Sequence, residues 1–187
     1  MRRNYFALGI TLFGAISLAI SGCDTTKINN SKLVIGMERA YQPFKWSQNS
    51  ANEHTLPIDG SSEHADGFDV AIAKYLGADL NKEVIIKRIG WLDLITSLNN
   101  GAINMILAGM SSTASRRQTI DFTDPYLASD LAFLIREDNI PAGNNQENPL
   151  DYQGLKDLFR GHSLICQSGV AGDDIIDTYF ASDTSLN

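Results

Sequence analysis

Two arginines follow a short turn in the stretch Ala108 to Arg117, AGMSSTASRR, and its residues have the chemistry to bind an anion. The guanidinium of Arg116 offers a carboxylate two parallel N–H groups, a geometry that a lysine ammonium does not provide. Gly109 lets the main chain approach closely, and Ser111 adds a hydroxyl. Taken alone, the pattern leaves a second interpretation open, in which Arg116 and Arg117 form a solvated basic corner with surface ion pairs.

The residue pattern gives less support to metal binding or catalysis. The long polar segment 47–66 contains five side chains able to bind a metal: Glu53, His54, Glu63, His64 and Asp66. Their spacing matches no structural zinc pattern, and such residues in a polar loop are usually solvated. No Ser-His-Asp arrangement falls at strand ends. We therefore expect no metal, no cofactor and no catalytic residues.

The N-terminus has the features of an exported lipoprotein. Two arginines precede an apolar run from Tyr5 to Ile20, which is short for a membrane span, and small residues follow. These features predict a signal peptide over 1–22. The stretch ISGC resembles a bacterial lipobox, which implies lipidation of Cys23 and anchoring of the exported protein to the bacterial cell membrane. An uncleaved membrane anchor is the alternative. Residues 23–31 are polar and aperiodic, as expected of a tether.

Charge and cysteine content exclude several classes of protein. Loss of the signal peptide would take the formal charge from −7 to −9, which disfavours nucleic acid as a partner. Hydrophobic residues make up 43% of the chain and charged residues 20%, as in ordinary globular proteins. Lipidation of Cys23 would leave Cys166 without a disulfide partner, and its apolar neighbours predict a buried thiol.

Alternating strands and helices predict an α/β fold. The expected order is a strand at 32–38, a helix at 69–77 capped by Asp69, a strand at 83–89, a helix at 91–101 and a strand at 103–108. This order implies a mainly parallel sheet with right-handed crossovers. Ligands bind such sheets at the carboxyl ends of the strands, where Glu38 and Ala108 lie.

A second series of elements begins after residue 130. Strands are expected at 131–136 and 163–167, with a helix at 173–180, and 47–66 is expected to be a surface loop. We therefore divide the chain into lobe 1 over 32–129 and a partial lobe 2 over 130–187, whose sheet would have unpaired edges.

At this point the chain resembles family 3 of the bacterial solute-binding proteins, the polar amino-acid receptors of ABC importers. The resemblance rests on several motifs in the family's order and spacing: YQPF from Tyr41, GFDV from Gly67, Trp91 with Leu94 and Ile95, the run from Ala108 to Arg116, and IDFTDPY from Ile120. It implies a two-lobed fold of the type II periplasmic-binding-protein kind. It also implies an amino-acid ligand, an ABC permease as partner, and a monomer that closes around its ligand.

The resemblance also assigns roles to residues of lobe 1. Ala108, Gly109, Ser111 and Arg116 match positions that bind the ligand carboxylate. Glu38 matches an acidic position near the ligand ammonium or a cationic side chain. Tyr41 and Trp91 match aromatic positions that enclose the ligand side chain, and with Glu38 they favour a basic amino acid through cation–π and charge attraction. An exposed carboxylate and ordinary core aromatics are the alternatives.

Two departures from the family pattern limit these expectations. In the turn resembling that of the second lobe, Gly169 is followed by Val170 and Ala171 where the family usually has hydroxyl residues, so only backbone N–H groups remain to meet the carboxylate. The chain is also shorter than family members, as expected of a C-terminal truncation. A non-functional truncated receptor and an enzyme resembling cyclohexadienyl dehydratase are therefore alternatives.

Overall fold

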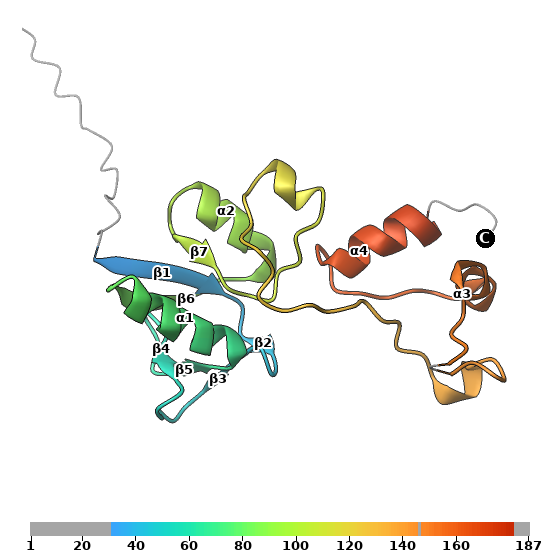
Figure 1. Ribbon diagram of the computed structural model, residues 1–187, viewed down its shortest axis with the longest axis horizontal. Helices are drawn as coiled ribbons and strands as arrows, with labels where there is room; N and C mark the ends of the chain where they lie inside the picture. Colours follow the sequence, from blue (N-terminus) through green and yellow to red (C-terminus); the bar gives the residue numbers. More distant parts are fainter. Residues whose placement is uncertain (1–30, 146, 182–187) are drawn as a thin grey trace, which may run out of the picture.

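The computed structural model describes residues 31–145 and 147–181 (Figure 1). The predicted signal peptide, the lipidation site Cys23 and nearly all of the tether lie outside these residues. Within the described residues, no helix is long and apolar enough to cross a membrane.

A three-stranded parallel sheet forms the centre of the first part of the chain. Its strands are β1 (Lys32–Met37), β6 (Glu83–Arg88) and β7 (Met105–Ile106), in the order β6-β1-β7. β-branched and other apolar residues of β1 and β6 suit a buried parallel sheet. The strands predicted from 32 and 83 are thus confirmed, whereas the third is shorter than the predicted 103–108.

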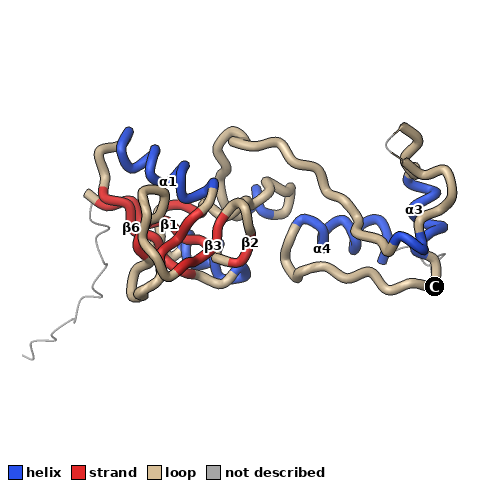
Figure 2. The backbone as a smooth tube through the Cα atoms, turned by 90° about the horizontal axis from the view of Figure 1, so that it is seen from below, coloured by secondary structure: helices blue, strands red, loops and turns tan. Residues whose placement is uncertain are grey.

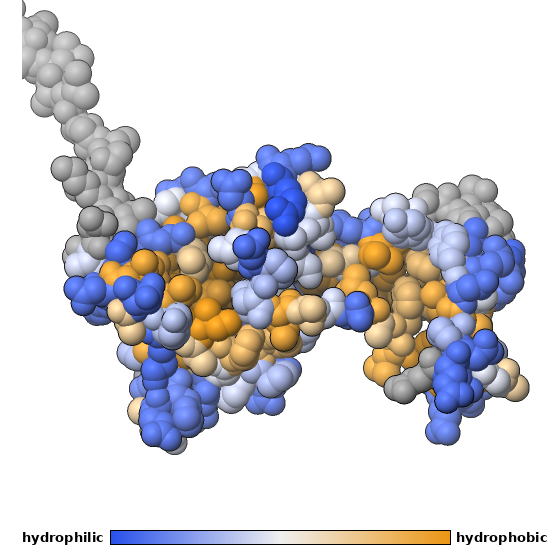
Figure 3. Space-filling model, viewed as in Figure 1, coloured by the Kyte–Doolittle hydropathy of each residue, from blue (hydrophilic) through white to orange (hydrophobic). Residues whose placement is uncertain are grey.

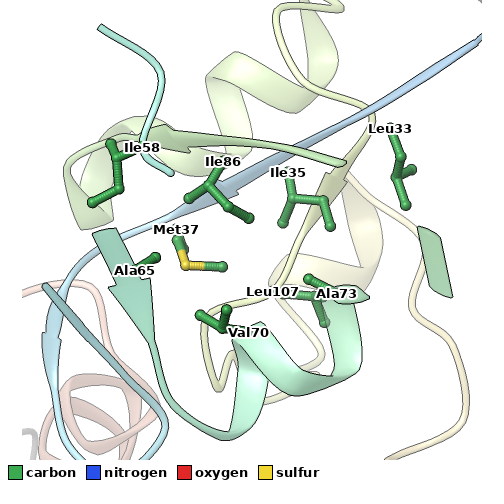
Figure 4. Close-up of a cluster of buried hydrophobic side chains, with 9 residues drawn as sticks. All are labelled: Leu33, Ile35, Met37, Ile58, Ala65, Val70, Ala73, Ile86 and Leu107. Atoms are coloured by element: carbon green, nitrogen blue, oxygen red, sulfur yellow. The ribbon is translucent and has the colours of Figure 1, made fainter. Parts of the chain in front are cut away.

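Two helices cover the opposite faces of this sheet. They are α1 (Phe68–Asp79) and α2 (Leu94–Asn99), the latter preceded by the 3₁₀ turn η1 (Trp91–Asp93). Leu33 and Ile35 point towards Val70 and Ala73 of α1 in the core cluster that Figure 4 shows. Gly36 points to the other face, where an added Cβ would lie 3.2 Å from Leu94 of α2. Alternate residues of β1 therefore face α1 on one side of the sheet and α2 on the other.

A second, antiparallel sheet includes parts of the segment predicted to be a loop. It comprises β2 (Ala40–Tyr41), β3 (Lys45–Gln48), β4 (Leu56–Pro57) and β5 (His64–Asp66) in the order β2-β3-β5-β4. The prediction of a surface loop over 47–66 is therefore wrong for 47–48, 56–57 and 64–66, which are strands, whereas the residues between them form turns and irregular structure. Ala65 of β5 and Ile58 are almost fully buried in the main core, so two apolar residues recruit an otherwise polar segment.

The second part of the chain is helical and extended, without a sheet in its described residues (Figures 1 and 2). It contains η3 (Glu137–Asn139), α3 (Tyr152–Phe159), α4 (Ala171–Ile176) and the π-helical turn η4 (Asp177–Ala181). Phe133, Phe159 and Phe180 form a small aromatic cluster, with Phe133 and Phe159 centroids 4.7 Å apart. The predicted helix at 173–180 is confirmed in outline.

The two strands predicted for this second part are wrong. Segments 131–136 and 163–167 pair with no other strand of the described chain, and their residues Leu134 and Ile165 are almost fully exposed. Apolar side chains of this part are visible at the surface in Figure 3. A strand needs a hydrogen-bonding neighbour, which apolar alternation alone does not supply. Cys166, predicted to be buried, is exposed as a consequence. The α/β class is confirmed.

Candidate functional site

A buried lysine contacts the backbone at the carboxyl end of the central sheet. Lys45, the first residue of β3, is 1% exposed, and its Nζ donates to the Ala108 carbonyl at 2.8 Å. Ala108 itself is buried, two residues after the end of β7. The contact connects the small antiparallel sheet to the end of the parallel one, where sheets of this kind bind ligands.

Aromatic rings and carboxylates surround this lysine. Its Nζ is 4.8 Å from the centroid of the Tyr41 ring and 6.0 Å from that of Trp91. Burial lowers the pKa of Lys45, and the negative charges of Glu38 and Asp69 oppose that shift. The site therefore has an internal cation between two of the aromatic side chains that the sequence singles out.

A second polar network positions Gly109. The Gly109 N–H donates to the Tyr126 hydroxyl at 3.2 Å, and this hydroxyl donates to Asp69 Oδ1 at 2.8 Å. Gly109 has a φ of +59°, a conformation that glycine adopts without strain. Burial raises the pKa of Asp69, and burial together with the Asp69 charge raises the pKa of Tyr126. The network connects α1, the strand end and the DPY motif.

Asp69 is therefore not the N-cap that the sequence predicts. Gly67 occupies the cap position, and Asp69 lies within the first turn of α1, fully buried. The first N–H groups of the helix donate instead to backbone carbonyls: Phe68 N to Pro43 O at 3.1 Å and Asp69 N to Phe44 O at 2.9 Å. With the backbone satisfied in this way, the carboxylate is left to bind Tyr126.

Arg116 is buried at the predicted position and its guanidinium binds two backbone carbonyls. It donates to Ser111 O at 2.7 Å and to Gly169 O at 2.7 Å, and its Cζ lies 5.3 Å from the Trp91 ring centroid. Burial lowers the pKa of Arg116, and the charge of Asp174 opposes the shift. An arginine side chain that is 8% exposed is not the solvated corner of the alternative interpretation. Its neighbour Arg117 is exposed.

The turn of the second part lies against the same arginine. Gly169, at φ +72°, accepts from Trp91 Nε1 at 2.9 Å as well as from Arg116. Its own N–H donates to Asp173 at 2.7 Å, so this N–H is already engaged. Val170 is the N-cap residue of α4 and Ala171 its first residue. Whether their backbone N–H groups meet a ligand carboxylate stays a prediction.

The structure thus brings most of the candidate residues together. Hydrogen bonds connect the following residues to one another or to a shared neighbour: Ala108, Gly109, Ser111, Arg116, Trp91 and Gly169. Lys45 connects Tyr41 and Glu38 to this group, because its ammonium lies over the Tyr41 ring and interacts electrostatically with Glu38. Sequence reasoning missed Lys45 and the buried role of Asp69 with Tyr126. The pairing of Tyr41 with Lys45, which places both side chains on one face of the sheet, is visible only in the structure.

The acidic and histidine-containing segment is organised by ion pairs. Glu63 contacts both Arg39, at 2.6 Å, and Arg88. His54 lies 3.3 Å from its neighbour Glu53 at the surface. His64 and Asp66 belong to β5. Within residues 31–145 and 147–181, no three histidine, cysteine or acidic side chains come together as a metal site.

Comparison with known proteins identifies a family that the chain matches. Residues 33–160 match the family described as bacterial extracellular solute-binding proteins, family 3. That stretch covers more than half of the chain and includes the strand end, Lys45, Asp69 and Arg116.

Individual relatives are similar over part of their length. An arginine-binding extracellular protein of Bacillus subtilis, ArtP, is 25% identical over 158 residues, which are 82% of this chain and 52% of that protein. The glutamine-binding protein GlnH of the same organism is 28% identical, covering 73% of this chain and 53% of GlnH. A probable histidine-binding protein of Neisseria gonorrhoeae is 30% identical over 51% of this chain. The chain spans about half the length of the first two of these relatives.

Solved structures of similar sequence include the holo form of ArgBP from T. maritima, 28% identical with a TM-score of 0.43 over 52% of this chain and 38% of that chain. The ancestral amino acid-binding protein AncCDT-1, a precursor of cyclohexadienyl dehydratase, is 28% identical with a TM-score of 0.43 over the same shares.

Proposed function

Because the chain belongs to the bacterial extracellular solute-binding proteins, family 3, we propose that it binds a polar amino acid for import by an ABC transporter. The observation that carries the proposal is Arg116, buried at the end of the parallel sheet with two N–H groups directed at acceptor oxygens. A ligand carboxylate offers the same kind of acceptor and adds a charge. The named curated relatives are all amino-acid-binding proteins, of differing ligands.

The remaining lobe-1 residues divide the ligand between them. Gly109 uses its N–H for Tyr126, which leaves its carbonyl for a ligand ammonium. Ser111 uses its carbonyl for Arg116, which leaves its exposed hydroxyl for the carboxylate. Glu38 and the rings of Tyr41 and Trp91 then face the ligand side chain. A basic side chain is the sequence-based hypothesis for this part of the site.

The cellular setting completes the proposal. The protein is a lipoprotein, exported by the signal peptide over 1–22 and anchored through Cys23, with residues 23–31 as tether. Lobe 1 spans 32–129 and lobe 2 begins at 130. It acts as a monomer and delivers its ligand to a permease, without catalysing a reaction. The motifs of the N-terminal sequence and the extracellular family support this setting.

Thermal unfolding of the full chain with a panel of amino acids tests the proposal. A ligand at one hundred times its Kd should raise the free energy of unfolding by about 2.7 kcal/mol, and hence the midpoint by roughly 10 °C. Arg116→Ala should remove this ligand-induced rise. Arg117→Ala is the matched control, because the Arg117 side chain is exposed and contacts Ser112 Oγ and the Phe122 ring, and it should leave the rise intact. A folded chain that responds to no amino acid would refute the proposal.

A further inference from the structure

Lys45 is the most deeply buried basic side chain near the ligand site, and no role in binding has so far been assigned to it. It is 1% exposed and lies opposite Tyr41 in the β2–β3 hairpin, so both side chains occupy the same face. Its ammonium donates to Ala108 O at 2.8 Å, the backbone at which the site begins. A lysine so buried is uncommon unless it is paired or used.

The position of the ammonium matters because of the rings around it. Nζ lies 4.8 Å from the Tyr41 centroid and 6.0 Å from the Trp91 centroid, within or at the range of cation–π attraction. Arg116 lies 5.3 Å from the same Trp91 ring. Both aromatic side chains are therefore already next to protein cations, and their electron-rich faces are partly engaged before any ligand arrives.

The carboxylates near Lys45 are also engaged before a ligand binds. Glu38 and Asp69 both interact electrostatically with Lys45. Asp69 is fully buried and bound to Tyr126, so it cannot reach a ligand. Glu38, the group expected to attract a cationic ligand side chain, has its charge offset by an internal cation.

We propose that Lys45 is a specificity-determining residue, which makes the site select an amino acid with an anionic or carbonyl-bearing side chain and disfavour a cationic one. This inference rests on the proposed function. It runs against the basic side chain expected from Glu38 and the two rings. A ligand side chain between Tyr41 and Trp91 approaches the ammonium, so a carboxylate or amide oxygen there is attracted and an arginine guanidinium is repelled.

The expected effect is large enough to measure. Unit charges about 6 Å apart in an environment of effective dielectric constant near 20 change a binding constant roughly hundredfold, which is about 2.7 kcal/mol. Changing Lys45 to methionine retains the length of the side chain and removes its charge. It should therefore weaken the binding of an acidic ligand by up to that factor and strengthen the binding of a basic one, so the ratio of their Kd values should change at least roughly hundredfold.

Calorimetric titration of the full chain with glutamate, glutamine and arginine tests the inference. The unmodified chain should bind glutamate or glutamine at least tenfold more tightly than arginine. Lys45→Met should move the ratio of the arginine and glutamate Kd values at least roughly hundredfold towards arginine, whereas Lys45→Arg should preserve the preference. Lys82→Met, in the turn after α1 and away from the site, is the matched control and should leave the ratio unchanged. Lys45→Gln, also uncharged, replaces Lys45→Met if that variant does not fold.

The outcomes separate the two proposals. Tightest binding of arginine by the unmodified chain, or an unchanged ratio in a folded uncharged variant, would overturn the role of Lys45 and leave the amino-acid receptor standing. Absence of binding by every amino acid would instead overturn the proposed function, and the role of Lys45 with it.

Discussion

The hydroxyl of Tyr126 is the point at which α1, the strand end and the DPY motif meet, so its removal is a direct test of the site's framework. Tyr126→Phe deletes one oxygen that donates to Asp69 at 2.8 Å and accepts from Gly109 N at 3.2 Å. The ring, which lies 6.0 Å from that of Phe68, remains. The substitution therefore changes hydrogen bonding with little change in packing.

The two lost bonds should have unequal costs. Asp69 is fully buried, and its Oδ2 already has no hydrogen-bond partner among the described residues, so loss of the Tyr126 hydroxyl would leave the carboxyl group only the nearby Gly109 N–H. A buried acceptor left unsatisfied costs about 1–3 kcal/mol. Gly109 is partly exposed, and water can replace the lost acceptor there at little cost. The expected loss is about 2 kcal/mol, or roughly 4–8 °C in the unfolding midpoint.

Urea and thermal unfolding of four chains would measure this loss: the unmodified chain, Tyr126→Phe, Asp69→Asn and the double variant. Tyr126→Phe should cost clearly less in the Asp69→Asn background, because a neutral amide is easier to leave unpaired than a carboxyl group that ionises. Tyr75→Phe on α1 is the control, since Tyr75 is 73% exposed. A loss below about 0.5 kcal/mol, or one that is equal in both backgrounds, would refute the network as described.

Two further predictions concern the same helix. Burial raises the pKa of Asp69 above its ordinary 3.8. The contribution of Asp69 to stability is therefore complete below that pH and is lost as the pH rises through the folded pKa. Asp69→Asn should gain stability relative to the unmodified chain above about pH 4, and parallel pH profiles of the two chains would contradict this. Gly67→Ala would place Cβ 2.4 Å from the Phe44 carbonyl oxygen at φ +123° and should cost more than about 2 kcal/mol in urea unfolding. Gly60 is the control, because it has φ +69° but no atom within 4 Å of an added Cβ, and Gly60→Ala should cost about 1 kcal/mol. Similar losses in the two variants would show that the close approach at Gly67 does not matter.

Local sequence patterns predicted lobe 1 well where one face of an element is buried. The run from Lys32 forms β1, and the periodic residues after Gly67 form α1, because both contribute side chains to a single core. The same reasoning failed for 131–136 and 163–167, whose apolar residues have no sheet to join in the described chain. Strand formation depends on a partner elsewhere, and a local pattern contains no information about that partner.

The candidate site divides in the same way. The sequence by itself determined that a glycine, a serine and an arginine follow a strand in the order typical of the family, because residue type and spacing express that chemistry directly. Only the tertiary structure decided that Lys45 lies beneath Tyr41 and reaches Ala108, 63 residues away, and that Asp69 faces Tyr126 rather than capping α1. Burial and pairing set the charge balance of the site, and both depend on contacts between segments that are distant in the chain.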